Sequence, residues 1–311
     1  MAKICQNCGG QMDEGNDVCL YCGIDAEEPE VQQQSKPSKA KSRIKRIIYF
    51  VAFGIFSVFF IVSAIYLGDY FLETVENKNT QNELIDMIEQ VKQQQAQLPT
   101  NPDGSVIVNP DEPLLYDPNS PILPEYQAIY AMNNDTVGWI RIEGTSINYP
   151  VMHHPSQKDY YLKKNFKGEY DKHGCVYLRE QCDAFKPSDN VVIYGHYMQD
   201  GTMFHDLHGY YKKDYWQEHQ FIQFDTLYER HTYQIIAVFK TSANIGEGYT
   251  YHLFNDAANE EEFNEFVRTV KSMSFYNTGV DAQYGDMLIT LSTCEYTLNN
   301  GRLVVVAKRI S

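Results

Sequence analysis

The chain has 311 residues, of which 43% are apolar and 14% aromatic, so it is long enough for one or two domains with a real hydrophobic core. Its formal net charge is −15. Residues 1–67 contain seven basic and seven acidic residues, so the whole net charge belongs to residues 68–311. This excess of acidic groups argues against a nucleic-acid partner and is compatible with a solvated domain or a cationic substrate.

Two C-x2-C-G motifs lie ten residues apart near the amino terminus. Four thiolates at this spacing suit one tetrahedral Zn²⁺, and a glycine after each pair lets the backbone turn so that its amides approach sulfur. We expect residues 1–24 to form a cytoplasmic zinc ribbon whose metal is structural, because no coordination position stays open. Two disulfides or a redox pair are the alternatives, disfavoured by a reducing cytoplasm and by the lack of a βαβ context. The expected ligands are Cys5, Cys8, Cys19 and Cys22.

A basic linker and an apolar segment follow. Residues 25–46 are rich in Glu, Gln, Ser, Lys and Pro, which predicts a flexible linker. Residues 47–67 are 21 uncharged, mostly apolar residues, enough for a helix that spans a bilayer. Basic residues precede this segment and acidic residues follow it, so the amino terminus is expected in the cytoplasm and the bulk of the chain outside. A cleaved signal peptide is the alternative, but the apolar run is long for one.

Residues 68–123 are expected to form an extracellular helix and a Pro-rich stalk. Within them, Asn82 to Leu98 predicts an amphipathic helix that ends at Pro99. Seven of the twelve prolines lie from Pro99 to Pro124, which excludes a regular element there. The apolar face of the helix consists of Leu84, Ile85, Ile88 and Val91.

Residues 124–311 contain short strand patterns separated by turn signals, which predicts a mainly antiparallel sheet or barrel. One helix is predicted at Glu260–Met273, with an apolar stripe typical of a core contact. The predicted strands are Gly138–Ile142, Ile147–Val151, Cys175–Leu178, Val191–Tyr194, Phe221–Leu227, Thr232–Lys240, Met287–Thr293 and Leu303–Ala307.

Cys294 is the best candidate nucleophile. It ends an apolar, β-branched run, and the turn Asn299-Asn300-Gly301 leads into the last strand, so Cys294 and Arg302 are expected on neighbouring strands near one end of a sheet. A thiol needs a nearby cation or proton acceptor to attack at neutral pH. Arg302 is always charged and cannot accept the proton. The competing interpretation is a buried cysteine that serves only packing.

His196 is the best candidate for the proton carrier. It follows the strand Val191–Tyr194 and Gly195, where loops on a rigid scaffold carry functional groups. The other histidines considered lie in a proline-containing loop or in a polar, aromatic segment. Cys175 and Cys182 are two further cysteines of this region, and they either form a disulfide or stay unpaired.

Residues from about 124 to 311 resemble a class B sortase. The resemblance implies a mainly β fold, a sortase-type β-barrel of about eight strands with added helices, of which Glu260–Met273 matches the helix that distinguishes class B. The zinc ribbon, the long stalk and the two extra cysteines depart from the usual pattern. The segments that carry the resemblance are Asp135–Ile140, Ile147–Val151, Tyr194–Met198, Gly201–Phe204, Thr290–Cys294 and Arg302.

The resemblance also implies the chemistry. Cys294 would attack the carbonyl after the threonine of a C-terminal sorting signal and form a thioester. His196 would be the general acid for the leaving amine and then the general base for the incoming amine. Arg302 would hold the substrate backbone and stabilise the oxyanion, supported by the hydroxyl of Thr293 and the backbone amide of Glu295. No cofactor is expected for catalysis.

The implied enzyme is a single-pass membrane transpeptidase on a Gram-positive-type bacterial surface, which joins surface proteins to an amine of a cell-wall precursor. Its partners would be surface proteins or pilins that carry a sorting signal. Three alternatives stay open: a pilin-polymerising sortase that uses a pilin amine, a plain cysteine peptidase, and a catalytically idle membrane sensor that signals through the zinc ribbon.

Overall fold

The computed structural model describes residues 3–5, 7–12, 18–23, 39–99, 113–186, 188–244 and 246–311. The chain forms two compact units, Met1–Tyr66 and Leu67–Ser311. Residues 25–38 of the expected linker, and the part of the Pro-rich stalk between residues 100 and 112, lie outside the described residues.

The amino-terminal unit begins with a small antiparallel hairpin. Strands β1 (Lys3–Ile4) and β2 (Gln11–Met12) pair with Lys3 opposite Met12. The side chains of Cys5, Met12 and Cys19 are buried together, and Cys22 packs against them. The hairpin therefore gathers the two cysteine motifs.

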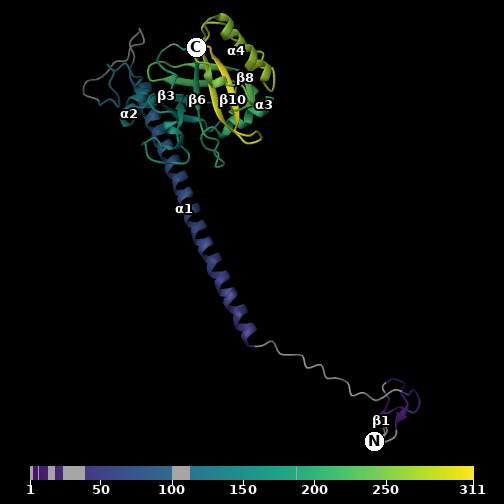
Figure 1. Ribbon diagram of the computed structural model, residues 1–311. Helices are drawn as coiled ribbons and strands as arrows, with labels where there is room; N and C mark the ends of the chain where they lie inside the picture. Colours follow the sequence, from purple (N-terminus) through teal and green to yellow (C-terminus); the bar gives the residue numbers. More distant parts are fainter. Residues whose placement is uncertain are drawn as a thin grey trace. The chain divides into compact units, whose positions relative to one another are not determined.

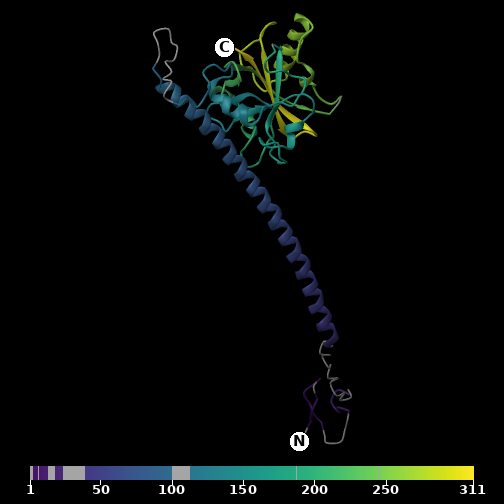
Figure 2. The ribbon, with the colours of Figure 1, turned by 90° about the vertical axis from the view of Figure 1, so that its left-hand side faces the viewer.

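Helix α1 (Lys39–Gln97) is one unbroken helix of 59 residues (Figure 2). The sequence predicts two helices, at residues 47–67 and at Asn82–Leu98, and a helix start at residue 47. In the structure the two form one helix, because residues 68–81 contain no proline and the single Gly68 costs a helix only about 1 kcal/mol. This helix begins at Lys39, eight residues before the predicted start. Within the described residues, one helix is long and apolar enough to cross a membrane, and the large apolar side chains of its segment 47–67 are exposed.

Eight strands of the second unit close into a barrel (Figure 1). Two neighbouring pairs, β4 with β5 and β6 with β9, are parallel, and the others are antiparallel. Closure gives each of these eight strands a partner on both sides. In barrel order the strands are β10 (Gly301–Arg309), β8 (Thr232–Ser242), β7 (Phe221–Thr226), β3 (Thr136–Arg141), β4 (Asn148–Met152), β5 (Val176–Leu178), β6 (Asn190–Tyr194) and β9 (Leu288–Glu295). The predicted mainly β barrel with added helices is confirmed.

Helix α4 (Glu260–Met273) has the predicted bounds and packs on β8 (Figure 1). The Asn259 side chain caps its first turn by accepting the Glu262 amide at 3.1 Å. Five short helical elements of the structure were not predicted. They are α2 (Pro124–Met132), α3 (Lys213–Glu218) and the 3₁₀ turns η1 (Tyr160–Lys163), η2 (His205–Tyr211) and η3 (Tyr251–Leu253). These elements are too short for a 3.6-residue period to stand out.

The end of α1 packs on the barrel through the face that the sequence predicts. Leu84, Ile88 and Val91 are each less than 5% exposed. Leu84 and Ile88 share a hydrophobic cluster with Trp139 of β3 and Tyr126 of α2. This part of α1 therefore belongs to the fold of the second unit.

Replacing Ile88 with Ala should destabilise the second unit by about 2–4 kcal/mol, because it removes a buried side chain and leaves a cavity. Gln90, which is exposed, provides the matched control Gln90→Ala on the same helix. Denaturant unfolding of the full chain in detergent measures the difference. Equal stability of the two variants would show that this face of α1 is not part of the core.

Candidate active site

Cys294 and Arg302 lie directly opposite each other. They pair in register on β9 and β10, and Glu295 pairs with Gly301 at the turn between the strands. A Cβ at Gly301 would lie 2.4 Å from the Glu295 carbonyl oxygen, so this position requires glycine. The adjacent-strand placement that the turn motif predicts is therefore present, and the half-buried Cys294 has a guanidinium on the next strand.

The Arg302 side chain is held by the turn before it. Its Nη1 donates to the Gly301 carbonyl at 2.8 Å and to Asn300 Oδ1 at 3.2 Å. Asn300 adopts the left-handed conformation, with φ of 50°. The turn thus positions the guanidinium at the same end of the barrel as Cys294.

The parallel pairing of β6 with β9 brings His196 to the same place. Tyr194 on β6 is opposite Ser292 on β9, and both strands run in the same direction. Two residues further along the chain come His196, just past the end of β6, and Cys294, which is still on β9. Gly195 permits the exit from β6, since a Cβ there would lie 2.6 Å from the Phe204 ring.

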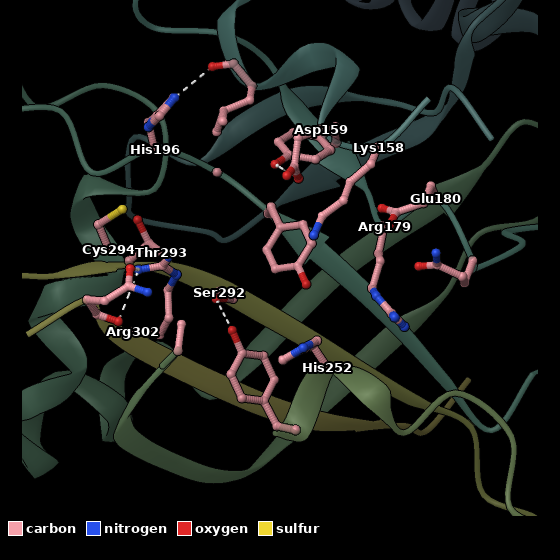
Figure 3. Close-up of a pocket in the computed structure, with 18 of the residues that line it drawn as sticks. Lys158, Asp159, Arg179, Glu180, His196, His252, Ser292, Thr293, Cys294 and Arg302 are labelled. Atoms are coloured by element: carbon pink, nitrogen blue, oxygen red, sulfur yellow. Dashed lines mark hydrogen bonds between the residues drawn. The ribbon is translucent and has the colours of Figure 1, made fainter. Parts of the chain in front are cut away.

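The ring of His196 is oriented by a backbone carbonyl. Nε2 lies 2.7 Å from the Leu162 oxygen, which only accepts, so Nε2 carries a proton and Nδ1 is the second site for proton exchange (Figure 3). Burial lowers the pKa of His196; the bond to Leu162 opposes this, and the positive charges of His173, Lys163 and Arg302 add to the lowering. Neutral imidazole therefore dominates at pH 7.

All three side chains line one cleft of about 520 Å³ (Figure 3). Its floor includes Ser292, whose hydroxyl is 2.6 Å from the hydroxyl of the buried Tyr251. A group of charged and polar residues also lines the cleft. These are Lys158, Asp159, Arg179, Glu180 and His252.

Sequence reasoning missed several residues of this site. Leu162 acts through its backbone carbonyl, so its side chain gives no signal. The ring of His208 contacts the backbone of Cys294, with Nε2 2.9 Å from the Cys294 carbonyl oxygen. Tyr251 and Arg179 come from short or irregular segments. Their aromatic and charged side chains were the only available clue.

Thr293 and Glu295 flank Cys294 in different ways. Thr293 is 2% exposed, and its hydroxyl has no hydrogen-bond partner within the described part of the chain. The carboxylate of Glu295 accepts the Thr297 amide at 2.9 Å and the Leu298 amide at 3.1 Å. Burial raises the pKa of Glu295, but the bonds to this turn outweigh it and leave the pKa lowered. Its side chain is therefore held by the turn that follows it.

Cys175 and Cys182 are both buried and unpaired. They form no disulfide with each other, so of the two alternatives the structure has the unpaired one. Burial raises the pKa of both thiols. Neither residue lines the cleft around Cys294.

The four amino-terminal cysteines gather at one point. Their sulfur atoms all lie within 4.8 Å of one another. Gly9 and Gly23 have φ near +70°, and their amides donate to the Cys5 and Cys19 carbonyls at 2.9 and 2.8 Å. These are the tight turns that the glycines predict. Four soft ligands in this arrangement are able to bind a metal such as Zn²⁺.

A family model described as "Sortase domain" matches residues 140–310, more than half of the chain. The chain belongs to the sortase family. It is 32% identical to "Sortase B" of Staphylococcus aureus (strain NCTC 8325 / PS 47) over 189 residues, 60% of this chain and 75% of that protein. The S. aureus sortase B–substrate complex matches with a TM-score of 0.64 and 26% identity over 77% of this chain and 99% of that one.

A sortase B solved in complex with triglycine is similar to this chain, with a TM-score of 0.60 and 26% identity over 77% of this chain and 98% of that chain. The sortase B relatives and the closed barrel make this chain a class B sortase. It is thus a sortase-type cysteine transpeptidase.

The ring of His196 should titrate below about 6.5, the usual value for an exposed histidine, because burial disfavours its charged form. NMR of histidine-labelled full chain in detergent measures this pKa, with the urea-unfolded chain as reference. A folded-state pKa at or above the unfolded value would contradict the geometry of the cleft.

Proposed function

We propose that this sortase is a membrane-anchored enzyme that cleaves a C-terminal sorting signal after Thr and transfers the protein to an amine of the cell wall. The observation that carries the proposal is the register of β6, β9 and β10, which brings Cys294, His196 and Arg302 to one end of one cleft. A nucleophile, a proton carrier and a fixed cation are the parts that acyl transfer needs.

In the first half of the reaction, the Cys294 thiolate attacks the carbonyl carbon of the Thr residue. The C–N bond then breaks, and the leaving amine takes a proton from the His196 imidazolium. A thioester between the sorting signal and Cys294 remains. Because His196 is mostly neutral at pH 7, only a minority of resting molecules hold thiolate and imidazolium together, which predicts modest turnover.

In the second half, an incoming amine attacks the thioester carbonyl, and His196 accepts the proton that this amine loses. The C–S bond then breaks, which forms the new amide and releases Cys294 as the thiolate. The oxyanion formed in both halves is stabilised by Arg302, the Glu295 backbone amide and the Thr293 hydroxyl. The Thr293 hydroxyl supports this role because it is buried without a partner among the described residues, so a bond to the oxyanion would satisfy it.

The substrates follow from the relatives. One similar S. aureus structure is a sortase B–substrate complex, and another similar sortase B is solved with triglycine. We carry over to this chain a peptide substrate in the cleft and a second substrate that presents an amine. A surface protein with a sorting signal and a cell-wall precursor fit these chemistries, and a pilin amine is an alternative second substrate.

The arrangement in the cell that we propose is a zinc ribbon in the cytoplasm (residues 1–24), a linker (25–46), an anchor helix (47–67), an external helix and stalk (68–123), and an external catalytic domain (124–311). The exposed apolar side chains of α1 support the anchor. In the ribbon, Cys5, Cys8, Cys19 and Cys22 would hold a structural Zn²⁺, for which the convergence of four sulfur atoms is the support.

Replacing Cys294 with Ala should reduce peptide cleavage at least about 1,000-fold, since the nucleophile is lost. Cys182→Ala is the matched control, because Cys182 is a buried thiol outside the cleft. The assay uses the full chain in detergent, sorting peptides and competing amines, with products identified by mass. Products of hydrolysis alone at saturating amine would contradict transpeptidation and favour a plain peptidase. An unchanged cell phenotype for Cys294→Ala would favour an idle sensor.

The purified full chain should contain one zinc ion, and Cys8→Ser should lower its zinc content while peptide cleavage stays unchanged. The reason is that the ribbon supplies four ligands and no part of the cleft. Elemental analysis measures the metal, with Cys175→Ser as the control outside the ribbon. Retention of full zinc content by Cys8→Ser would argue against a four-cysteine site.

A further inference from the structure

A buried histidine outside the cleft lies between two carboxylates. His173 is fully buried, with Nδ1 3.0 Å from Asp171 Oδ1 and Nε2 3.0 Å from Asp200 Oδ2. A neutral imidazole has only one N–H, whereas both ring nitrogens of His173 face carboxylate oxygens. The two carboxylates therefore favour an imidazolium in the interior, and their bonds outweigh the burial that would otherwise lower the pKa of His173.

Asp200 connects His173 to the loop that carries His196. This loop, residues 195–204, is called the His196 loop. Asp200 Oδ1 accepts from the Thr202 hydroxyl at 2.6 Å and from the Thr202 amide at 3.1 Å, so it fixes the loop internally. Phe204 closes the loop, because its amide donates to the His196 carbonyl at 2.8 Å. One carboxylate thus braces the loop with one oxygen and binds His173 with the other.

A second connection runs to the carbonyl that orients the His196 ring. The segment 171–175 is bonded to η1 at both ends: the Asp171 amide donates to the Lys163 carbonyl, and the Cys175 amide donates to the Tyr161 carbonyl. Between them, a Cβ at Gly174 would lie 2.5 Å from the Leu162 oxygen. The same Leu162 oxygen accepts from His196 (Figure 3). The segment that holds His173 therefore packs directly against the Leu162 carbonyl oxygen, which accepts the hydrogen bond from His196.

Residues 70–77 of helix α1, which come shortly after the apolar segment 47–67, contact the cluster of His173, Asp171 and Asp200. Thr74 places its hydroxyl 3.3 Å from both His173 Nε2 and Asp200 Oδ2. Asn77 donates to Asp171 Oδ2 at 2.5 Å, and the Tyr70 ring stacks on His173 with 5.7 Å between ring centroids. The neighbouring residue Lys172 pairs with Glu73 of α1 at 3.3 Å.

We propose that His173, held between Asp171 and Asp200, is a positioning residue for His196, and that it fastens the His196 loop to the part of α1 next to the anchor. The inference rests on the proposed role of His196. Asp200 of this cluster braces the loop that carries His196. The segment 171–175, which holds His173, packs against the Leu162 carbonyl that accepts from the His196 ring. A displacement of about 1 Å in such a ring is enough to slow proton transfer strongly.

The test compares His173→Gln, Asp200→Asn and their double variant in the full chain in detergent. Each single variant should lower kcat between about 10- and 100-fold with a change in KM below about twofold, because the reacting geometry is altered and the peptide cleft is not. The double variant should lose no more than the worse single variant, since the residues act as one unit. In His173→Gln the ring of His196 should titrate at a higher pH, because one positive charge that lowers its pKa is removed.

Two variants on α1 test the connection to the helix. Thr74→Val should reproduce part of the kcat loss. Glu76→Gln, which breaks only the exposed ion pair with Lys167, should leave kcat unchanged. All rates are measured at a temperature where circular dichroism shows each variant folded, so loss of fold does not enter the comparison.

Unchanged kcat and unchanged His196 titration in folded His173→Gln and Asp200→Asn would overturn the inference. A kcat that falls only in proportion to the folded fraction would overturn it as well. If His196→Ala itself retained activity, the proposed role of His196 would fail, and this inference with it. Loss of activity in His196→Ala together with wild-type behaviour of the cluster variants would contradict the inference alone.

Discussion

The parallel pairing of β6 with β9 is the constraint on which the site depends. It aligns Tyr194 with Ser292, so that the chain leaving β6 and the end of β9 reach the same level of the barrel. The antiparallel pairing of β9 with β10 then places Arg302 opposite Cys294. Three residues separated by up to 106 positions in the sequence meet because backbone hydrogen bonds fix two registers. A slip of one residue in either pair would turn the side chains to the other face.

The surroundings of the site determine its protonation. His196 is partly buried and near other positive charges, which keeps its imidazole mostly neutral, while the Leu162 carbonyl holds the ring by one nitrogen. This arrangement suits a group that exchanges protons in both directions, since neither state is locked by a carboxylate. His173 has the opposite environment, with a carboxylate at each nitrogen, and this suits a fixed support. The local partners of the two histidines therefore give their imidazole rings opposite preferences for the charged form.

Much of the fold was predictable because its signals are local. The strands around Cys294 and the helix at Glu260–Met273 follow from β-branched runs, turn residues and a 3.6-residue apolar period. The placement of Cys294 beside Arg302 follows from a short turn. Barrel closure and the parallel β6–β9 pair depend on residues distant in sequence, so composition and period alone do not give them. The family resemblance implied the barrel of about eight strands, whereas the parallel β6–β9 pair was not predicted.

Other features had no signal in the sequence. Leu162 contributes a carbonyl, which every residue has. His173 lies in a short loop, and its significance comes from Asp200 and Thr74, which are distant in sequence. The continuity of α1 was missed because the apolar anchor and the amphipathic face have different patterns, although nothing between them ends a helix.

We propose that Cys294 carries the acyl group during transfer. Intact mass spectrometry of the full chain, incubated with a library of sorting peptides and no added amine, followed by peptide mapping, tests it most directly. We expect one acyl adduct, located on Cys294, that disappears when an amine is added. Cleavage of the peptide with no adduct in Cys294, or with the adduct on Cys175 or Cys182, would contradict it.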